Sequence, residues 1–261
     1  MSKNLIYTTA INSDTSQFNN SEYSQYCINS WTAWCKKMDI DFLVIDKMTG
    51  PTVNNNYKYP VWAKDLIFDY VGDKYDKIIY VDSDTMVKWD APNPFDLYTD
   101  EFCVVNDRAS IGWILRSLDA YKPFFPKAAT DDFILDNYFN SGVCFFTKEH
   151  KYIFDELQGL YLHYGQDLDL IKGVGKVQTV LNYVLKLNKV KIKYLPPTWN
   201  LFSIHKKDMF KHNWQLNEDP TPFFIKYAFI WHFTGFPIED RTRIMRDVWL
   251  RYKDNYGAKA K

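Results

Sequence analysis

This chain of 261 residues lacks several features that would assign it to a functional class directly. It has no excess of charge of either sign, because 32 Lys and Arg residues balance 32 Asp and Glu residues. Nonspecific nucleic-acid binding needs a basic surface, so that class of partner is not expected. No run approaches the roughly 20 apolar residues of a transmembrane helix, and the N-terminal residues contain no signal-peptide core. We therefore expect a soluble, cytoplasmic protein.

Cysteine is also scarce and carries no motif. The four cysteines are Cys27, Cys35, Cys103 and Cys144, and none of them forms a C-x-x-C pair. This spacing signals neither a zinc site nor a disulfide framework. We expect these residues to be small buried hydrophobic side chains in a reducing compartment.

The chain does contain enough apolar residues for one sizeable core. Hydrophobic residues make up 46% of the sequence and charged residues 25%, which argues against wholesale disorder. Aromatic residues reach 18%; flat rings pack well on the apolar face of a sugar, but an aromatic-rich core explains the figure equally simply. With no repeat, no low-complexity segment and no linker, the length predicts a single domain over residues 1–261.

The first eighty residues alternate between strand-like and helix-like patterns. The predicted strands are 5–10, 41–45 and 77–81, and the predicted helices between them are 22–38 and 60–71. This alternation is typical of an α/β fold with a parallel sheet and crossover helices. Such sheets bind ligands at the carboxyl ends of their strands, and Asp82 and Asp84 follow the third strand directly.

The second half of the chain has a less regular pattern. Residues 107–135 are predicted to be rich in loops, and the tail at 251–261 to be a flexible end. The predicted strands here are 102–106, 143–147 and 191–195, and the predicted helices are 151–162 and 177–187. Together the two halves predict a mixed, mostly parallel sheet flanked by helices.

The segment Asp82-Ser83-Asp84 carries the clearest chemistry. Two carboxylates at positions i and i+2 beyond a hydrophobic strand suit a hard divalent cation that also binds phosphate oxygens. Such a cation acts as a Lewis acid and neutralises the charge on a departing nucleoside diphosphate. A turn that caps a helix uses the same residue types, so the tripeptide alone leaves both interpretations open.

The same segment also fits the D-x-D-x-T motif of haloacid-dehalogenase-like phosphatases. In those enzymes the first Asp is a nucleophile and the second is a general acid/base. The motif normally opens the catalytic sheet, whereas two βα units precede it here. Asp131 and Asp132 could imitate the acidic metal-binding pair of such a phosphatase, although no clear apolar strand precedes them. A phosphatase therefore stays open as an alternative.

Three motifs in a fixed order resemble glycosyltransferase family 8, which includes glycogenin and the bacterial lipooligosaccharide galactosyltransferases. They are the block at 75–98, the segment Phe139-Asn140-Ser141-Gly142-Val143 and the segment Ile230-Trp231-His232-Phe233-Thr234-Gly235. The resemblance spans about residues 5–235 and implies a GT-A fold, which is a Rossmann-like α/β architecture that binds nucleotide sugars. It also implies a nucleotide-binding half at about 1–105 and an acceptor half at about 106–250.

The resemblance further implies a metal site and a donor site. It assigns the metal, Mn²⁺ or Mg²⁺, to Asp82, Asp84 and His232, since an imidazole is a reasonable third ligand. It places Gln178 near the reacting carbon and Asp107 in contact with the sugar. A glycine in the second motif lets the backbone approach a ligand, and its asparagine can bond sugar hydroxyls. The residues that it assigns to the donor, a UDP-sugar, are Thr9, Asn12, Lys64, Ser83, Asn140, Ser141, Gly142, Gly235 and Arg241.

Two departures from the family pattern bear on activity. The acidic residue expected before Gln178 is Val177, which removes a carboxylate that usually helps to grip the donor sugar. The lysine expected after the last glycine is Ile238, which leaves Arg241 or Arg243 to hold the diphosphate. A non-catalytic relative that binds a sugar nucleotide or a glycan is therefore a further alternative.

The favoured prediction is a metal-dependent hexosyltransferase that moves a sugar from a UDP-hexose to a hydroxyl group of a glycan acceptor. The resemblance implies retention of the anomeric configuration. In that chemistry the metal and nearby cations stabilise the leaving diphosphate. No general base on the protein is strictly needed, because an oxygen on the front face of the donor can take the acceptor proton.

Overall fold

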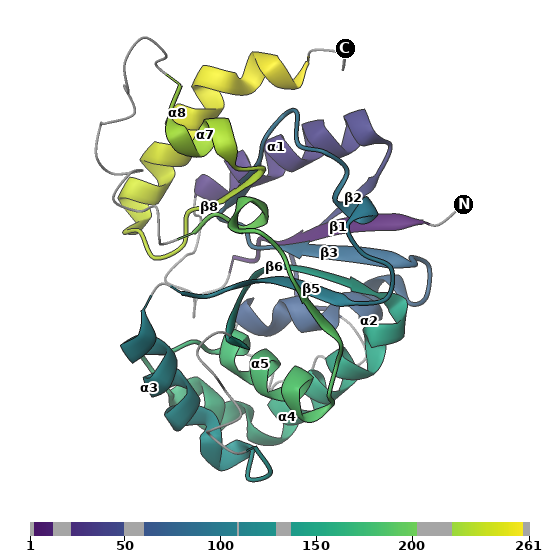
Figure 1. Cartoon of the computed structure of the whole chain (residues 1–261), viewed down its shortest axis with the longest axis vertical. Helices are drawn as coiled ribbons and strands as arrows, with labels where there is room; N and C mark the ends of the chain where they lie inside the picture. Colours follow the sequence, from purple (N-terminus) through teal and green to yellow (C-terminus); the bar gives the residue numbers. More distant parts are fainter. Residues whose placement is uncertain are drawn as a thin grey trace.

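A mixed six-stranded sheet forms the centre of the computed structural model, which describes residues 3–12, 22–49, 60–108, 110–128, 137–202 and 221–257. The strands lie in the order β2-β1-β3-β6-β5-β7 (Figure 1). In this sheet as described, β6 alone runs antiparallel to the others. The strands are β1 (Asn4–Thr9), β2 (Asp41–Ile45), β3 (Lys77–Val81), β5 (Phe102–Asn106), β6 (Phe139–Thr147) and β7 (Ile192–Tyr194). The predicted mixed, mostly parallel α/β sheet is confirmed.

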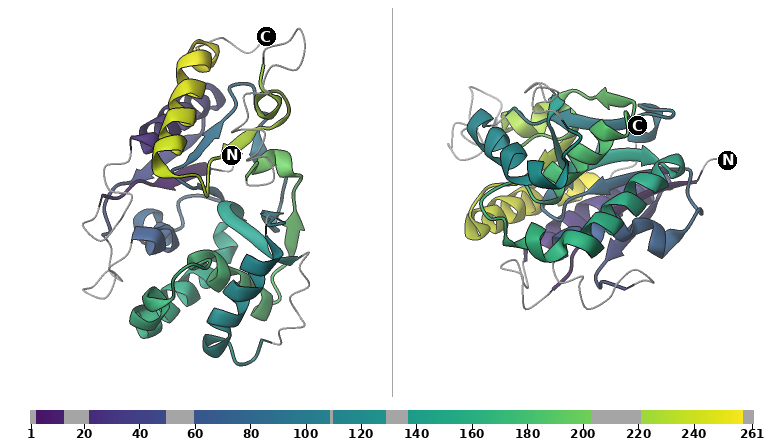
Figure 2. Two further views of the ribbon diagram at one scale, coloured as in Figure 1. Left: turned by 90° about the vertical axis from the view of Figure 1, so that its left-hand side faces the viewer. Right: turned by 90° about the horizontal axis from the view of Figure 1, so that it is seen from below.

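Helices cover both faces of this sheet, as the two further views in Figure 2 also show. One face carries α1 (Tyr23–Met38) and α8 (Ile238–Tyr256). The other side carries α2 (Ile67–Val71), α3 (Ile111–Tyr121), α4 (Lys151–Leu170) and α5 (Val177–Leu187). The shorter helices are α7 (Phe223–Tyr227) and the 3-10 turns η1 (Pro60–Leu66), η2 (Pro94–Asp96), η3 (Lys122–Phe124), η6 (Lys148–His150) and η7 (Pro197–Trp199). Within the described ranges, no helix combines the length and the hydropathy needed to cross a membrane.

Alternation of side chains along the strands produces two layers of core. In β3, Ile78 and Tyr80 belong to the core that α4 and α5 cover, whereas Ile79 and Val81 belong to the core that α1 and α8 cover. Successive side chains of a strand point to opposite faces, so both sets must be apolar in a strand buried on both sides. The apolar run from residue 78 to residue 81 meets this requirement and makes β3 predictable from the sequence.

The antiparallel pairing of β3 with β6 brings two of the predicted motifs together. Val81 pairs with Val143, and the N–H of Asp82 donates to the carbonyl of Gly142 at 2.7 Å. Strand β6 begins at Phe139, four positions earlier than the predicted strand at 143–147. The first residues of β6 therefore lie beside the carboxyl end of β3, because the two strands run in opposite directions.

A small second sheet, which the sequence did not predict, lies next to this edge. It consists of β4 (Thr85–Val87) paired antiparallel with β8 (Ile230–His232), and Thr85 lies opposite His232. The N–H of Phe233 donates to the carbonyl of Asp84 at 2.9 Å. This pairing places the segment at 230–235 next to Asp82-Ser83-Asp84.

The C-terminal end differs from the prediction of a flexible tail. The chain is helical from residue 251 through Tyr256, and residues 258–261 lie outside the described part. The Tyr256 side chain is buried, its hydroxyl donates to the carbonyl of Val87, and its ring packs edge-on against Trp89. These contacts hold the last turns of α8 in place, although their composition is polar.

Residues 107–135 also contain more regular structure than predicted. Helix α3 begins after Ser110, whose hydroxyl accepts a hydrogen bond from the N–H of Trp113 and so caps the helix. Its buried face includes Ile114 and Leu118 at i and i+4, which is the spacing of a single helical stripe. The predicted helix at 60–71 is instead the 3-10 turn η1 followed by the short α2.

A buried carboxyl group lies on η1, in the core between the sheet and α4. Asp65 is almost fully buried, and Gln158 of α4 donates to its backbone carbonyl at 2.8 Å. Its side-chain Oδ2 has no hydrogen-bond partner among the described residues. Burial raises the pKa of Asp65 to about 7, although the neighbouring Lys64 acts in the opposite direction.

The stability of the protein should therefore fall with rising pH because of Asp65. A carboxyl pKa of about 7 in the folded state, against an ordinary value of 3.8, means that folding takes up a proton between these values. The contribution of Asp65 to stability is complete below about pH 4 and is lost as the pH rises through the folded-state pKa. Replacement by the neutral isostere removes this loss.

From pH 5 to pH 8, we expect the free energy of unfolding of wild type to fall by on the order of 3 kcal/mol relative to that of Asp65→Asn. Chemical denaturation at both pH values measures this change. Asp90→Asn is the control, because Asp90 is exposed on the surface. If the difference between Asp65→Asn and wild type is the same at both pH values, the assigned cause is wrong.

Candidate active site

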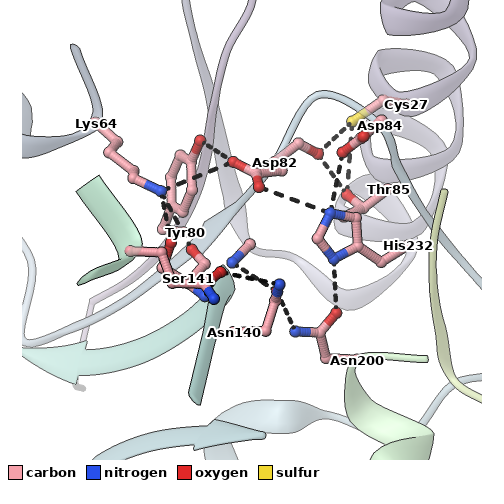
Figure 3. A network of polar contacts seen from close by, with 12 residues as sticks. Cys27, Lys64, Tyr80, Asp82, Asp84, Thr85, Asn140, Ser141, Asn200 and His232 are labelled. Atoms are coloured by element: carbon pink, nitrogen blue, oxygen red, sulfur yellow. Dashed lines mark hydrogen bonds and ion pairs between the residues drawn. The ribbon is translucent and has the colours of Figure 1, made fainter. Parts of the chain in front are cut away.

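Three potential metal ligands converge beyond the carboxyl end of β3. Asp82 and Asp84 follow this strand, and the small sheet places His232 opposite Thr85. One ligand atom from each of the three residues lies within 4.8 Å of the others. Figure 3 shows both carboxylates turned toward the imidazole ring. The structure therefore brings together the three residues that the sequence predicts as metal ligands.

The His232 ring presents Nε2 to both carboxylates. This nitrogen lies 3.1 Å from Oδ1 of Asp84 and 3.6 Å from Oδ2 of Asp82, yet it has no partner with hydrogen-bond geometry among the described residues. Buried polar atoms are normally hydrogen-bonded, so an unsatisfied nitrogen aimed at two carboxylates requires an explanation. A shared divalent cation supplies one, because carboxylate oxygens and imidazole nitrogens are both metal ligands. The donor set thus fits a metal ion.

Asp84 is the more buried of the two carboxylates and has a cationic partner. The guanidinium of Arg241, on the first turn of α8, lies 3.1 Å from Oδ2 of Asp84 and packs over the ring of Tyr23. Burial works to raise the pKa of Asp84, but the positive charges of a protonated His232 ring and of Arg241 outweigh it and lower the pKa to about 2. Asp84 is therefore ionised at neutral pH.

Asp82 is the more open carboxylate, since 33% of its side chain is exposed against 9% for Asp84. The hydroxyl of Tyr80 donates to Oδ1 of Asp82, and the ammonium of Lys64 lies 4.0 Å from the same oxygen. Lys64 in turn donates to Oγ of Ser141 at 3.0 Å. The sequence did not single out Tyr80, but its position two residues before Asp82 puts it on the same face of the chain.

The packing around Gly142 leaves no space for a side chain. This requirement for glycine is stricter than the predicted one, which was that the backbone can approach a ligand. A Cβ atom at this position would lie 2.1 Å from Cε1 of His232 and 2.6 Å from Oδ2 of Asp82. Both distances are far shorter than a van der Waals contact. Any side chain at position 142 would therefore occupy the space between two of the candidate metal ligands.

A second set of polar residues, centred on Gln178, lies next to the three candidate ligands. Gln178, on the first turn of α5, accepts hydrogen bonds from Nδ2 of Asn140 at 3.1 Å and from the N–H of Ser141 at 3.2 Å. It donates through Nε2 to Oδ2 of Asp107, which directly follows β5, at 3.0 Å. The two predicted catalytic residues are thus in contact with each other and with the start of β6.

The remaining predicted donor-site residues lie at or beyond the ends of β1, β3 and β8. Thr9 ends β1, and its Oγ1 is 3.3 Å from the hydroxyl of Tyr80. Ser83 stands between the two aspartates, and Gly235 adopts a left-handed φ of 73° in the turn after β8. Asn12 is exposed beyond the end of β1.

The two departures from the family pattern, Val177 and Ile238, supply no polar side chain to the site. Val177 is 1% exposed, and its side chain packs in the core that α5 covers. Arg243 is exposed on α8, where it pairs with Asp240 at 3.2 Å. Asp131 and Asp132 lie outside the described residues.

The sequence of the chain matches one protein family over most of its length. Residues 3–237 match the profile of glycosyl transferase family 8. The chain belongs to glycosyl transferase family 8. Membership confirms the resemblance carried by the three motifs and makes the protein a glycosyltransferase. No curated protein sequence matches this chain.

Solved structures similar to this family 8 chain share its fold at low sequence identity. A glycosyltransferase involved in the glycosylation of the major capsid of PBCV-1 is 12% identical, with a TM-score of 0.58 over 94% of this chain and 99% of that chain. The bifunctional glycosyltransferase WbbM is 15% identical, with a TM-score of 0.60 over 98% of this chain and 52% of that chain. The galactosyltransferase LgtC, solved with donor and acceptor sugar analogs, is 15% identical, with a TM-score of 0.51 over 96% of this chain and 99% of that chain. These similarities confirm the predicted GT-A fold.

Family 8 membership overturns the phosphatase alternative. That alternative needs Asp82 to be a nucleophile after the first strand of the catalytic sheet. In this family 8 protein Asp82 follows β3, the third strand in the chain, and its carboxylate faces an imidazole and a lysine ammonium.

The packing around Gly142 predicts that Gly142→Ala strongly weakens Mn²⁺ binding by this family 8 protein. The added methyl group would displace His232 or Asp82, because it overlaps both side chains. We expect the affinity for Mn²⁺ to fall by on the order of 100-fold or more, as measured by titration of the electron paramagnetic resonance signal of free Mn²⁺.

Gly159→Ala is the matched control for this substitution. Gly159 lies in α4, and a Cβ atom there would meet nothing within 4 Å. This variant should keep the wild-type Mn²⁺ affinity and gain roughly 0.5–1 kcal/mol of stability from higher helix propensity. Unchanged Mn²⁺ affinity in a folded Gly142→Ala protein would contradict the assigned ligand geometry.

Proposed function

We propose that this family 8 enzyme transfers a hexose from a UDP-hexose to a hydroxyl group of a glycan acceptor, with a divalent metal bound by Asp82, Asp84 and His232. The observation that carries the proposal is the unsatisfied Nε2 of His232 facing two carboxylates at the carboxyl edge of β3. This edge is where open α/β sheets bind their ligands.

The proposed metal is Mn²⁺ or Mg²⁺, since carboxylate oxygens dominate the donor set. When bound, it supplies Lewis-acid stabilisation of the negative charge on a leaving diphosphate. The guanidinium of Arg241, 3.1 Å from Oδ2 of Asp84, favours the negative charge of this carboxylate. The greater exposure of Asp82 favours approach of the donor phosphates from its side of the site.

We assign the grip on the diphosphate to Lys64. Its ammonium lies beside the exposed carboxylate of Asp82 and is held there by Ser141 and by the Tyr80 ring, 4.8 Å from its centroid. A fixed cation at this position attracts an anionic ligand without a large loss of side-chain entropy. The further donor contacts in the proposal are Thr9, Asn12, Ser83, Asn140, Gly142, Gly235 and Arg241.

Gln178 and Asp107 are the residues proposed to act at the reacting sugar. Gln178 bonds to the N-S-G segment at the start of β6, beside Asp82, and Asp107 accepts a hydrogen bond from Gln178. We propose transfer with retention of the anomeric configuration, which needs no general base on the protein. In the proposed arrangement residues 1–105 bind the nucleotide and residues 106–250 bind the acceptor.

The proposed cellular setting is the cytoplasm. All four cysteines are buried and unpaired, which favours a reducing compartment. A cytoplasmic supply of nucleotide sugar would then be directly available to the enzyme.

A second candidate function is binding of a sugar nucleotide without turnover. The observation that favours it is the buried, apolar Val177 at the position where the family pattern has a carboxylate for the donor sugar. This candidate predicts tight donor binding with no release of nucleoside diphosphate.

Release of nucleoside diphosphate from a panel of UDP-, GDP- and dTDP-sugars with Mn²⁺ tests the proposal. We expect one UDP-hexose to be turned over, and Asp84→Asn to lose at least ~100-fold in turnover because it removes a metal ligand. Asp90→Asn, a change of an exposed carboxylate, should keep wild-type activity. Retention predicts a product anomer that matches the donor, so an inverted product would sink that part of the proposal.

The two candidate functions separate in the same experiment. Binding of a donor with no release of nucleoside diphosphate, whichever acceptor is added, would favour the non-catalytic candidate. If wild type binds none of the donors, the nucleotide-sugar proposal fails as a whole.

A further inference from the structure

Asn200 lies on the side of the His232 imidazole that faces away from Asp82 and Asp84 (Figure 3). It directly follows η7 and is fully buried. Its Oδ1 lies 2.9 Å from Nδ1 of His232, and its Nδ2 donates to Oδ1 of Asn140 at 3.0 Å. Figure 3 shows this asparagine joining the imidazole to the start of β6. A buried polar side chain with both ends engaged has a single orientation.

The backbone of β6 fixes the orientation of both asparagine amides. The N–H of Gly142 can only donate, and it donates to the side chain of Asn140 at 2.9 Å, so the atom that it meets is the oxygen. The N–H of Ser141 likewise identifies Oε1 of Gln178 as an acceptor, which pairs with Nδ2 of Asn140. Two backbone donors therefore determine which end of Asn140 is which.

The orientation of Asn140 in turn determines the orientation of Asn200 and the position of a proton on His232. Oδ1 of Asn140 can only accept, so Asn200 must present its NH₂ group to Asn140 and its oxygen to His232. An oxygen facing Nδ1 requires a proton on Nδ1. The lone pair of the neutral ring is then on Nε2, the nitrogen that faces Asp82 and Asp84.

We propose that Asn200 is a positioning residue that fixes the tautomer and the plane of the His232 ring, so that Nε2 is available to a metal ion. This inference rests on the proposed function, in which His232 is a metal ligand. A histidine that binds a metal through one nitrogen normally donates from the other, and loss of that outer partner weakens metal binding. The chain of bonds ends at the N–H of Gly142, so the backbone of β6 sets the tautomer through two asparagines.

The network also reaches the residues proposed to act on the sugar. Asn140 donates to Gln178, and Gln178 donates to Asp107. Asn200 and Asn140 thus connect the metal side of the site with its sugar side through directional bonds. Such bonds hold several side chains in one arrangement before a ligand binds, which lowers the cost of ordering them.

The tautomer of His232 tests the inference without any ligand. In protein labelled with ¹⁵N-histidine, the two ring nitrogens of a neutral histidine give distinct signals for the protonated and the bare nitrogen. His232→Gln identifies the His232 signals among those of the five histidines. We expect the proton on Nδ1 of neutral His232 in wild type and a mixture of tautomers in Asn200→Ala. A proton on Nε2 with Nδ1 bare in wild type would overturn the proposal.

Metal affinity tests the consequence for the site. We expect Asn200→Ala to weaken Mn²⁺ binding by roughly 10- to 100-fold. Asn200→Asp should recover only part of that loss, because an aspartate still accepts the Nδ1 proton but can no longer donate to Oδ1 of Asn140. Asn182→Ala is the matched control: Asn182 is also buried, but it bonds only to the backbones of Phe139 and Gln178 among the contacts that the structure describes. Its Mn²⁺ affinity should stay within about twofold of wild type.

The outcomes separate this proposal from the proposed function. Equal losses of Mn²⁺ affinity in Asn200→Ala and Asn182→Ala would indicate general loosening of the site and overturn the role of Asn200. A wild-type protein that shows the Nδ1 proton but binds no Mn²⁺ would overturn the metal role of His232, and with it both proposals. Mn²⁺ binding that depends on Asn200, together with no turnover of any donor, would support the positioning role and contradict the transfer reaction.

Discussion

The backbone pairing of β4 with β8 is the interaction on which the candidate site depends. It sets His232 opposite Thr85 and joins the N–H of Phe233 to the carbonyl of Asp84, so an imidazole from near the end of the chain meets two carboxylates from its first half. Leu201 extends the pairing through two backbone bonds to β8. Its N–H donates to the carbonyl of Ile230, and its carbonyl accepts from the N–H of His232. Backbone hydrogen bonds fix register to one residue, and a shift by one would turn the His232 side chain to the opposite face.

Charge compensation is the second constraint. Two carboxylates close together and partly out of water repel each other, and burial alone disfavours their charged forms. Arg241 offsets the charge of Asp84 from the side of α8, and Lys64 approaches Asp82 from η1. The carboxylate oxygens that face His232 are not those engaged by Arg241 and Lys64, so the two cations do not compete with a metal ion for the same oxygens. The helices on both sides of the sheet thus contribute to the electrostatics of one site.

The sequence predicted what depends on long, regular patterns and missed what depends on distant partners. Strands such as β3 were predictable because a strand buried on both faces needs a continuous apolar run. β4 and β8 have three residues each, too few for a periodic signal, and they exist only as a pair. The D-S-D segment was predictable as ligand-binding, because the carboxyl edge of a parallel sheet gathers ligand-binding residues. The N-S-G segment, at the start of the antiparallel β6, was assigned to the same site by its resemblance to the family motif. The position of Arg241 against Asp84, and that of Asn200 behind His232, follow from packing between elements that no local pattern encodes.

The most direct test of this account is a crystal structure of the protein with Mn²⁺ and UDP, measured with anomalous scattering at the manganese absorption edge. We expect a single strong anomalous peak within coordination distance of a carboxylate oxygen of Asp82, a carboxylate oxygen of Asp84 and Nε2 of His232, with the diphosphate on the more exposed side of Asp82. A manganese peak elsewhere, or a structure with UDP bound and Nε2 of His232 hydrogen-bonded to a carboxylate in place of the ion, would contradict the central claim that these three side chains form a metal site.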